Sequence, residues 1–177
     1  GEENIEEFRN VIRMCYRDNM PLSIVECKTP IFRYFIDIDF ISNMGLKIET
    51  MKEYVKDILR LIKECFIEES GNMDSIYKTY GYMTSPRPKI KNNEEYIKTG
   101  CHVYIPGLHV DGQIALGVRM YIVKKMTELH PLHKWNEIID ESVYKGPGGL
   151  RLPYTSKLEK CKCKIKKACG LCANGTI

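Results

Sequence analysis

The strongest strand pattern in the chain runs from Phe32 to Phe40 and reads Phe-Arg-Tyr-Phe-Ile-Asp-Ile-Asp-Phe. Aromatic and β-branched residues dominate it, which is typical of a buried strand. Side chains on a strand alternate between its faces, so one face is apolar and the other bears Asp37 and Asp39. Two carboxylates about 7 Å apart repel each other, and a divalent cation, Mg²⁺ or Mn²⁺, usually offsets that cost. The short motif also fits an exposed sheet face that happens to contain two aspartates.

The segments around this strand predict an α+β fold. Apolar residues at helical spacing indicate helices over residues 5–19, 48–66 and 111–130, the last capped by Asp111. Further strands are expected at residues 22–27, 76–84, 101–105 and 150–152. Prolines and lysines predict a loop without regular structure over 85–93. The elements lack a regular β-α-β period, which favours a mixed or antiparallel sheet.

A second polar segment surrounds Gly100. Lys98 and His102 flank this glycine, which lets backbone N–H groups approach a ligand such as a phosphate. If the strand over 101–105 pairs with the first strand, His102 shares a face with the two aspartates. A hydrogen-bonded structural histidine is the alternative.

A third segment begins at Asp140 and ends at Lys157. An aspartate with apolar neighbours is followed by Arg151 and Lys157, which predicts one more metal ligand and two anion contacts. The alternative is a capping aspartate followed by a solvated basic strand.

The eight cysteines fall into two groups. Four stand alone in apolar patterns and predict buried free thiols: Cys15, Cys27, Cys65 and Cys101. The other four lie within twelve residues and predict a structural Zn²⁺ site, with an incomplete or oxidised cluster as the alternative: Cys161, Cys163, Cys169 and Cys172. Six lysines and one glutamate between Lys157 and Lys167 make this region locally basic, in a chain of net charge +4.

The composition is that of one ordinary soluble domain of 177 residues, 44% hydrophobic and 28% charged. The longest stretch without a charge is twelve residues, 99–110, so no segment is expected to cross a membrane. The absence of a signal peptide and the clustered cysteines predict an intracellular, reducing location. We expect a core over residues 1–157 and a basic cysteine-rich tail over 158–177, together excised from a longer polypeptide.

The three polar segments resemble the archaeo-eukaryotic primase superfamily, in the branch of PrimPol-type enzymes and the primase-helicases of large DNA viruses. The family's Asp-x-Asp/Glu is similar to Asp37-Ile38-Asp39, and its small-x-His after a lysine is similar to Gly100-Cys101-His102 after Lys98. Its third block looks like Ile139-Asp140, Val143-Tyr144, Arg151-Leu152 and Ser156-Lys157. The blocks occur in the family's order and span 32–157, most of the chain.

This resemblance implies an RRM-like sheet flanked by helices and a DNA primase/polymerase that transfers nucleotides from (d)NTPs on a single-stranded template during DNA replication. It implies that Asp37, Asp39 and Asp140 hold two Mg²⁺ or Mn²⁺ ions. The implied nucleotide-binding residues are Lys98, Gly100, His102, Arg151 and Lys157. A helicase or ATPase domain is expected on the same full-length chain, which would act at a virus replication site in the host cell.

Two positions depart from the family pattern. Gly100 stands where many PrimPol-type members have serine, although the large-virus branch has glycine there. Gly148-Gly149 replaces an Arg-Asn pair, so part of a phosphate or template contact is absent. No Gly-x4-Gly-Lys-Ser/Thr loop occurs, so the fragment is not expected to hydrolyse ATP as a motor.

Two rival functions remain open at this point. One is a catalytically idle nucleic-acid-binding module, in which the tail and the loop around Arg87 hold DNA or RNA. The other is a metal-dependent glycosyltransferase or nuclease, which also uses Asp-x-Asp but does not account for the segment from Asp140 to Lys157.

Overall fold

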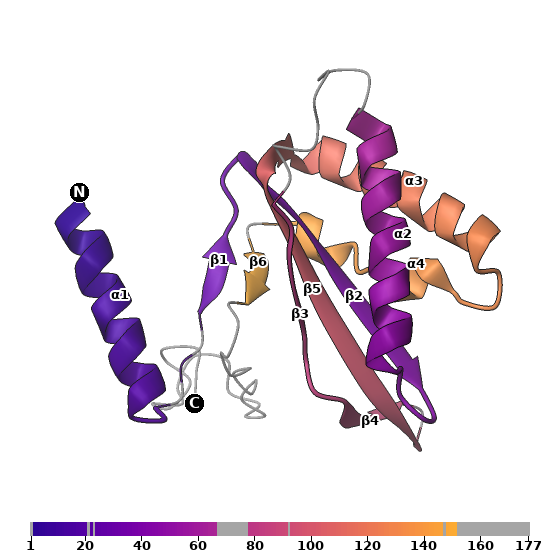
Figure 1. Ribbon diagram of the computed structural model, residues 1–177, viewed down its shortest axis with the longest axis horizontal. Coiled ribbons are helices and arrows are strands. Elements are labelled where there is room, and N and C mark those ends of the chain that lie inside the picture. The colour runs from indigo at the N-terminus through magenta and orange to yellow at the C-terminus, as the bar shows by residue number, and fades with distance from the viewer. Residues whose placement is uncertain are drawn as a thin grey trace, which may run out of the picture. The chain divides into compact units, whose positions relative to one another are not determined.

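The computed structural model describes residues 2–20, 22, 24–66, 78–91, 93–146 and 148–151 (Figure 1). The chain divides into two compact units, Gly1–Glu26 with Arg151–Ile177, and Cys27–Leu150. The second unit contains the main sheet and the helices that cover it, so it is the unit that positions the candidate site.

The first unit contains helix α1 (Glu2–Arg17), close to the predicted helix over 5–19. Its ion pairs join Glu6 to Arg9 and Arg13 on the exposed helix surface. Exposed pairs of this kind contribute little stability.

Strands β1 (Val25–Cys27) and β6 (Gly148–Arg151) have bounds close to those of the predicted strands at 22–27 and 150–152.

Strand β2 (Ile31–Ser42) contains the aromatic and β-branched stretch and pairs antiparallel with β5 (Glu94–Asp111). The register shifts once, between Arg33 and Tyr34. β5 is much longer than the predicted 101–105, because it continues through Pro106 and Gly107 instead of ending there. Both residues lie at the shift, where β5 has residues without a β2 partner, and such a bulge tolerates residues that a regular ladder excludes.

Strands β3 (Tyr80–Met83) and β4 (Arg87–Lys91) also pair antiparallel with β5. The pairs of this four-stranded sheet are therefore antiparallel, and together with the helices they confirm the α+β class. The prediction that 85–93 lacks regular structure was wrong, because β4 occupies most of it. Pro88 is compatible with an edge strand, because a strand at the edge of a sheet does not need the backbone N–H that proline lacks.

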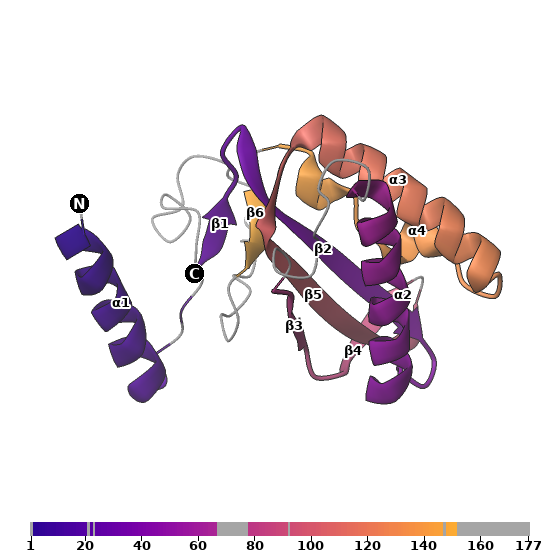
Figure 2. The same cartoon turned by 45° about the horizontal axis from the view of Figure 1, so that its top comes forward.

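Helices α2 (Ile48–Phe66) and α3 (Gly112–Leu129) pack against each other and lie on the same side of the sheet (Figures 1 and 2). Asp111 caps α3 as predicted, since its carboxylate accepts a 2.8 Å hydrogen bond from the backbone N–H of Ile114. The short helices α4 (Trp135–Ile138) and η1 (Ser142–Tyr144) follow α3.

The hydrophobic core lies between these helices and one face of the β2–β5 pair. Tyr34, Ile36 and Ile38 are completely buried there, and Val103 of β5 joins them. Trp135 is also buried, which fits a packing role for the single tryptophan. No helix among the described residues is long and apolar enough to cross a membrane.

The prediction of four buried free thiols holds for Cys101 alone. Cys27 and Cys65 are exposed and Cys15 is half-buried. Apolar neighbours in the sequence did not bury them, because Cys27 belongs to a strand of three residues and Cys65 to the last turn of α2. Burial, together with the negative charge of Asp37, raises the pKa of the Cys101 thiol to about 11, so this thiol stays protonated at neutral pH.

Candidate active site

The face of the β2–β5 pair opposite the core bears most of the candidate site. The register places Asp37 opposite His102 and Asp39 opposite Gly100. Opposite residues of an antiparallel pair point to the same face, so the first two polar segments meet on one surface. The side chains of Asp37 and Asp39 are 14% and 21% exposed, so both are largely buried.

His102 bridges Asp37 and a tyrosine. Its Nε2 lies 3.3 Å from Asp37 Oδ1, and its Nδ1 shares a 2.6 Å hydrogen bond with the Tyr82 hydroxyl. The ring is buried and packs edge-on against that of Tyr82. Because both ring nitrogens have partners, the orientation of the imidazole beside Asp37 is fixed. Tyr82 was not among the residues singled out from the sequence, since only the pairing of β3 with β5 places it there.

Asp39 is held by Lys98. The Lys98 Nζ donates a short hydrogen bond to Asp39 Oδ2, and both side chains are largely buried. This cation offsets the repulsion between the two carboxylates that the sequence indicated.

Gly100 lies so close to Asp39 that a larger residue would crowd the side chains around it. A Cβ at position 100 would lie 3.0 Å from Thr84 Oγ1 and 3.1 Å from Asp39 Oδ1. Thr84 donates its backbone N–H to the Gly100 carbonyl at 2.9 Å and accepts from the Gly100 N–H at 3.2 Å. The glycine therefore allows the backbone of β5 to lie directly against the carboxylate.

Asp140 comes next to Asp37 from a distant part of the chain. Ile139 forms an isolated antiparallel bridge with Ile38, and the Asp140 N–H donates to the Asp37 carbonyl oxygen at 3.0 Å. The Asp140 carboxylate accepts hydrogen bonds from the Ser142 N–H at 2.8 Å and the Ser142 hydroxyl at 2.9 Å. The backbone thus places the third predicted carboxylate across from the first, on the side of β2 away from β5.

A buried arginine fixes the segment that contains Asp140. Arg119 of α3 is 3% exposed and donates to the carbonyl oxygens of Ile139 and Asn136, both at 2.9 Å, and to Asn136 Oδ1 at 3.0 Å. Its guanidinium also lies 3.8 Å from Glu141. The sequence contained a signal for this role, because Arg119 occupies the buried stripe of α3 formed by Ala115, Val118 and Ile122. A cation at such a position needs buried acceptors.

The chemistry of these side chains fits a hard divalent cation, since Asp37, Asp39 and Asp140 offer carboxylate oxygens alone. Among the residues that the structure describes, no three His, Cys, Asp or Glu side chains converge closely enough to hold one ion. Each carboxylate instead has a neighbour of its own: Asp37 lies beside His102, Asp39 beside Lys98, and Asp140 beside Ser142.

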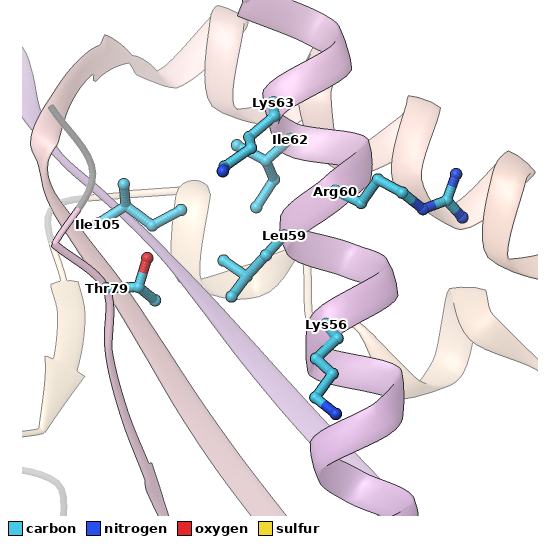
Figure 3. Close-up of a pocket in the computed structure, with 7 residues that line it drawn as sticks. All are labelled: Lys56, Leu59, Arg60, Ile62, Lys63, Thr79 and Ile105. Atoms are coloured by element: carbon cyan, nitrogen blue, oxygen red, sulfur yellow. The ribbon is translucent and has the colours of Figure 1, made fainter. Parts of the chain in front are cut away.

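Two of the hollows near the sheet differ in their position relative to the carboxylates. One, of about 440 Å³, opens beside Asp39, and its lining includes Tyr96 and His133. The other, of about 400 Å³, lies between α2 and the sheet edge and is lined by Lys56, Leu59, Arg60, Ile62, Lys63, Thr79 and Ile105 (Figure 3). Ile105 belongs to the core-facing side of β5, so only the first hollow adjoins the carboxylates.

Five predicted site residues lie outside the described part of the chain: Lys157, Cys161, Cys163, Cys169 and Cys172. Arg151 is described as the last residue of β6 and is half-buried, but it belongs to the first unit. The structure therefore brings together Asp37, Asp39, Lys98, Gly100 and His102 on one face, with Asp140 beside Asp37.

Two comparisons with known proteins bear on the family of this chain. No curated protein matches the chain. A family model described as the C962R protein N-terminal AEP domain matches residues 1–162. The chain therefore belongs to this family of archaeo-eukaryotic primase-type domains.

Proposed function

We propose that this domain catalyses template-directed nucleotidyl transfer from nucleoside triphosphates, as the primase/polymerase core of a DNA-replication protein. The main support is the register of β2 and β5, which places Asp37 and Asp39 on one face with Lys98 and His102. Membership in a primase-type family supports the same reaction. Carboxylates and cations side by side suit phosphoryl transfer, which depends on alignment and charge stabilisation more than on a strong base.

In this reaction a 3′-hydroxyl oxygen attacks the α-phosphorus of the incoming nucleotide. The bond from that phosphorus to the oxygen of the leaving pyrophosphate breaks, and the hydroxyl proton passes to solvent. Asp37, Asp39 and Asp140 would hold Mg²⁺ or Mn²⁺, which supplies charge stabilisation to the hydroxyl and the triphosphate. Lys98 and His102 would contact phosphate oxygens, with Arg151 and Lys157 as further contacts and Gly100 leaving room for the ligand.

The test is incorporation of labelled dNTPs and NTPs on single-stranded templates, with and without an annealed primer, in Mg²⁺ and in Mn²⁺. The control is the double variant Asp37→Ala/Asp39→Ala. We expect metal-dependent product from the wild-type chain and none from the variant. Equal product from both proteins would overturn the assignment of the carboxylates.

A catalytically idle nucleic-acid-binding module is the second candidate. It is favoured by the absence of a converged group of metal-binding side chains among the described residues and by the individual partner of each carboxylate. Binding of single-stranded DNA without any Mn²⁺ binding, measured by calorimetry on the same sample, would favour this candidate over the polymerase.

Three further proposals concern the rest of the protein. The cysteines Cys161, Cys163, Cys169 and Cys172 would bind a structural Zn²⁺ ion, which zinc analysis of the purified chain would test. A helicase or ATPase would belong to the same full-length chain, and the whole would act at a virus replication site. The single-stranded template and the nucleoside triphosphates are the partners that the reaction requires.

A further inference from the structure

The hairpin formed by β4 and β5 extends the carboxylate-bearing face of the sheet. Arg87 lies opposite Lys98, and Lys89 lies opposite Tyr96. Lys98 points to the carboxylate face, because it contacts Asp39. Residues opposite each other, or two apart on one strand, share a face, so Arg87, Lys89 and Tyr96 lie on that face too. We call these three residues the hairpin strip.

The two cations of the hairpin strip are available to a ligand. Arg87 and Lys89 are both exposed. Unlike Lys98, neither takes part in an ion pair within the described part of the chain. Of the nearby acids, Glu94 accepts a short hydrogen bond from the Tyr96 hydroxyl, and Glu95 lies opposite Ile90 on the other face, although it lines one hollow together with Arg87 and Tyr96. Positive charge therefore predominates along the strip, which fits a polyanion.

Tyr96 lines two hollows. One hollow of about 400 Å³ is lined by Arg87 and Tyr96 together with Asn43, Pro86, Pro88, Glu95 and Ile97. The hollow of about 440 Å³ beside Asp39 is also lined by Tyr96. Gly100, which is opposite Asp39, lies four positions along β5 from Tyr96, so the path between them is about 14 Å, or a few nucleotides.

We propose that the hairpin strip binds single-stranded nucleic acid and guides it towards the carboxylates. Arg87 and Lys89 contact backbone phosphates, and an unpaired base stacks on the ring of Tyr96 at the hollow. Cations interleaved with an aromatic ring are the usual means of holding a single strand without sequence preference. The proposal deepens and rests on the proposed function, since the strand bound here is the template or primer of that reaction.

The test is fluorescence anisotropy with a fluorescein-labelled oligo(dT) 12-mer, in EDTA, at several NaCl concentrations, using the full chain. The variant Arg87→Ala/Lys89→Ala is compared with Lys52→Ala/Lys124→Ala, which removes two exposed lysines from the helices on the other face. Both variants lose two positive charges. Thermal melts of each variant establish that it is folded.

We expect the hairpin variant to bind the oligonucleotide roughly 10- to 30-fold more weakly at 0.1 M NaCl. The slope of log K against log [NaCl] should fall by about 1.4, because each phosphate contact to a single strand contributes about 0.7. The helix variant should keep the wild-type affinity within about twofold. Tyr96→Phe should retain binding, whereas Tyr96→Ala should weaken it roughly fivefold or more, through lost stacking.

Equal losses in the two double variants, or no loss in the hairpin variant, would overturn the proposal and assign binding to the basic tail. Failure of the wild-type chain to bind the oligonucleotide would overturn it as well. Asp37→Asn/Asp39→Asn separates this inference from the proposed function, because it should abolish incorporation and leave DNA affinity in EDTA undiminished. If the wild-type chain binds the oligonucleotide through the hairpin strip but incorporates no nucleotide, the binding proposal stands and the proposed polymerase function is wrong.

Discussion

The two faces of the β2–β5 pair differ in both composition and environment. The face under α2 and α3 presents Tyr34, Ile36 and Ile38, all completely buried. The opposite face presents Asp37 and Asp39, each beside a residue of β5 that can be cationic. Since side chains alternate along one strand, a single segment contributes to the core through one face and to the candidate site through the other. Substitutions on the two faces should therefore have separable consequences.

The largest expected effect is on activity and comes from the carboxylate face. Asp37→Asn should lower nucleotide incorporation roughly 100- to 1,000-fold, because an amide oxygen replaces an anionic one next to the reacting phosphates. The midpoint of thermal unfolding should stay the same or rise, since one of two neighbouring like charges is removed. Incorporation and melting are measured on the same preparation. Full activity in this variant would contradict the proposal that the carboxylate face is needed for catalysis.

The core-facing neighbour Ile38 should show the opposite pattern. Ile38→Ala removes a completely buried side chain and should lower the free energy of unfolding by about 2–5 kcal/mol. Urea denaturation measures this loss. The folded fraction should retain most of its incorporation rate, so a selective loss of activity without loss of stability would contradict the assignment of this face.

Arg119 should couple the two properties, because it extends from α3 to the segment that places Asp140 beside Asp37. Arg119→Met leaves the buried carbonyl of Ile139 and the part-buried carbonyl of Asn136 without their donor, and should lower the free energy of unfolding by about 2–4 kcal/mol. Arg119→Lys restores one donor and the charge, and should recover part of the loss.

Mn²⁺ affinity at a temperature where the variants are folded tests the coupling. We expect Arg119→Lys to bind Mn²⁺ more weakly than the wild type. If Arg119→Lys causes no further loss of Mn²⁺ affinity in an Asp140→Asn background, the arginine acts on the metal through Asp140. An unchanged Mn²⁺ affinity in folded Arg119→Lys would mean that Arg119 contributes to stability and not to metal binding.

Gly100 and Gly117 provide a matched pair of smaller effects. Gly100→Ala should lower the free energy of unfolding by about 1–3 kcal/mol, because the new Cβ meets Thr84 and Asp39. Gly117→Ala, in α3, meets nothing within 4 Å and should stabilise the protein by about 0.5–1 kcal/mol. Differential scanning calorimetry compares the two variants. Equal shifts would contradict the close approach of β5 to Asp39.

The smallest effect should come from His133, at the edge of the core. Its Nε2 shares a 2.7 Å hydrogen bond with the Tyr54 hydroxyl, and its ring packs edge-on against Phe40 and Trp135. Burial lowers the pKa of His133 below 6.5, and the nearby His130 lowers it further. The unfolded chain then binds more protons than the folded one, so stability falls as pH drops from about 6.5 towards the folded pKa.

Urea midpoints at pH 7.5 and 5.5 test this dependence. His133→Gln should reduce the difference between the two midpoints, since the glutamine does not titrate. A pH dependence identical to that of the wild type would assign it to groups other than His133.

Several parts of the fold could be predicted because they depend on local patterns. The alternation from Phe32 to Phe40, the apolar stripe over 48–66 and the cap at Asp111 all appear in the structure. The strand β4 was missed, because prolines that interrupt a central strand are tolerated at an edge, and edge position is a property of the sheet. The exposure of Cys27 and Cys65 was missed for the same kind of reason, since burial depends on what packs from elsewhere in the chain.

The sequence by itself determined which residues share a face of β2 and which residue types are able to bind a metal or a phosphate, since both follow from strand periodicity and side-chain chemistry. Only the tertiary structure decided that His102 lies between Asp37 and Tyr82 and that Lys98 holds Asp39. It also decided that Asp140 reaches Asp37 across an isolated bridge fixed by Arg119. Each of these contacts joins residues at least 20 positions apart in the chain, and strand register and buried hydrogen bonding over such separations follow from packing.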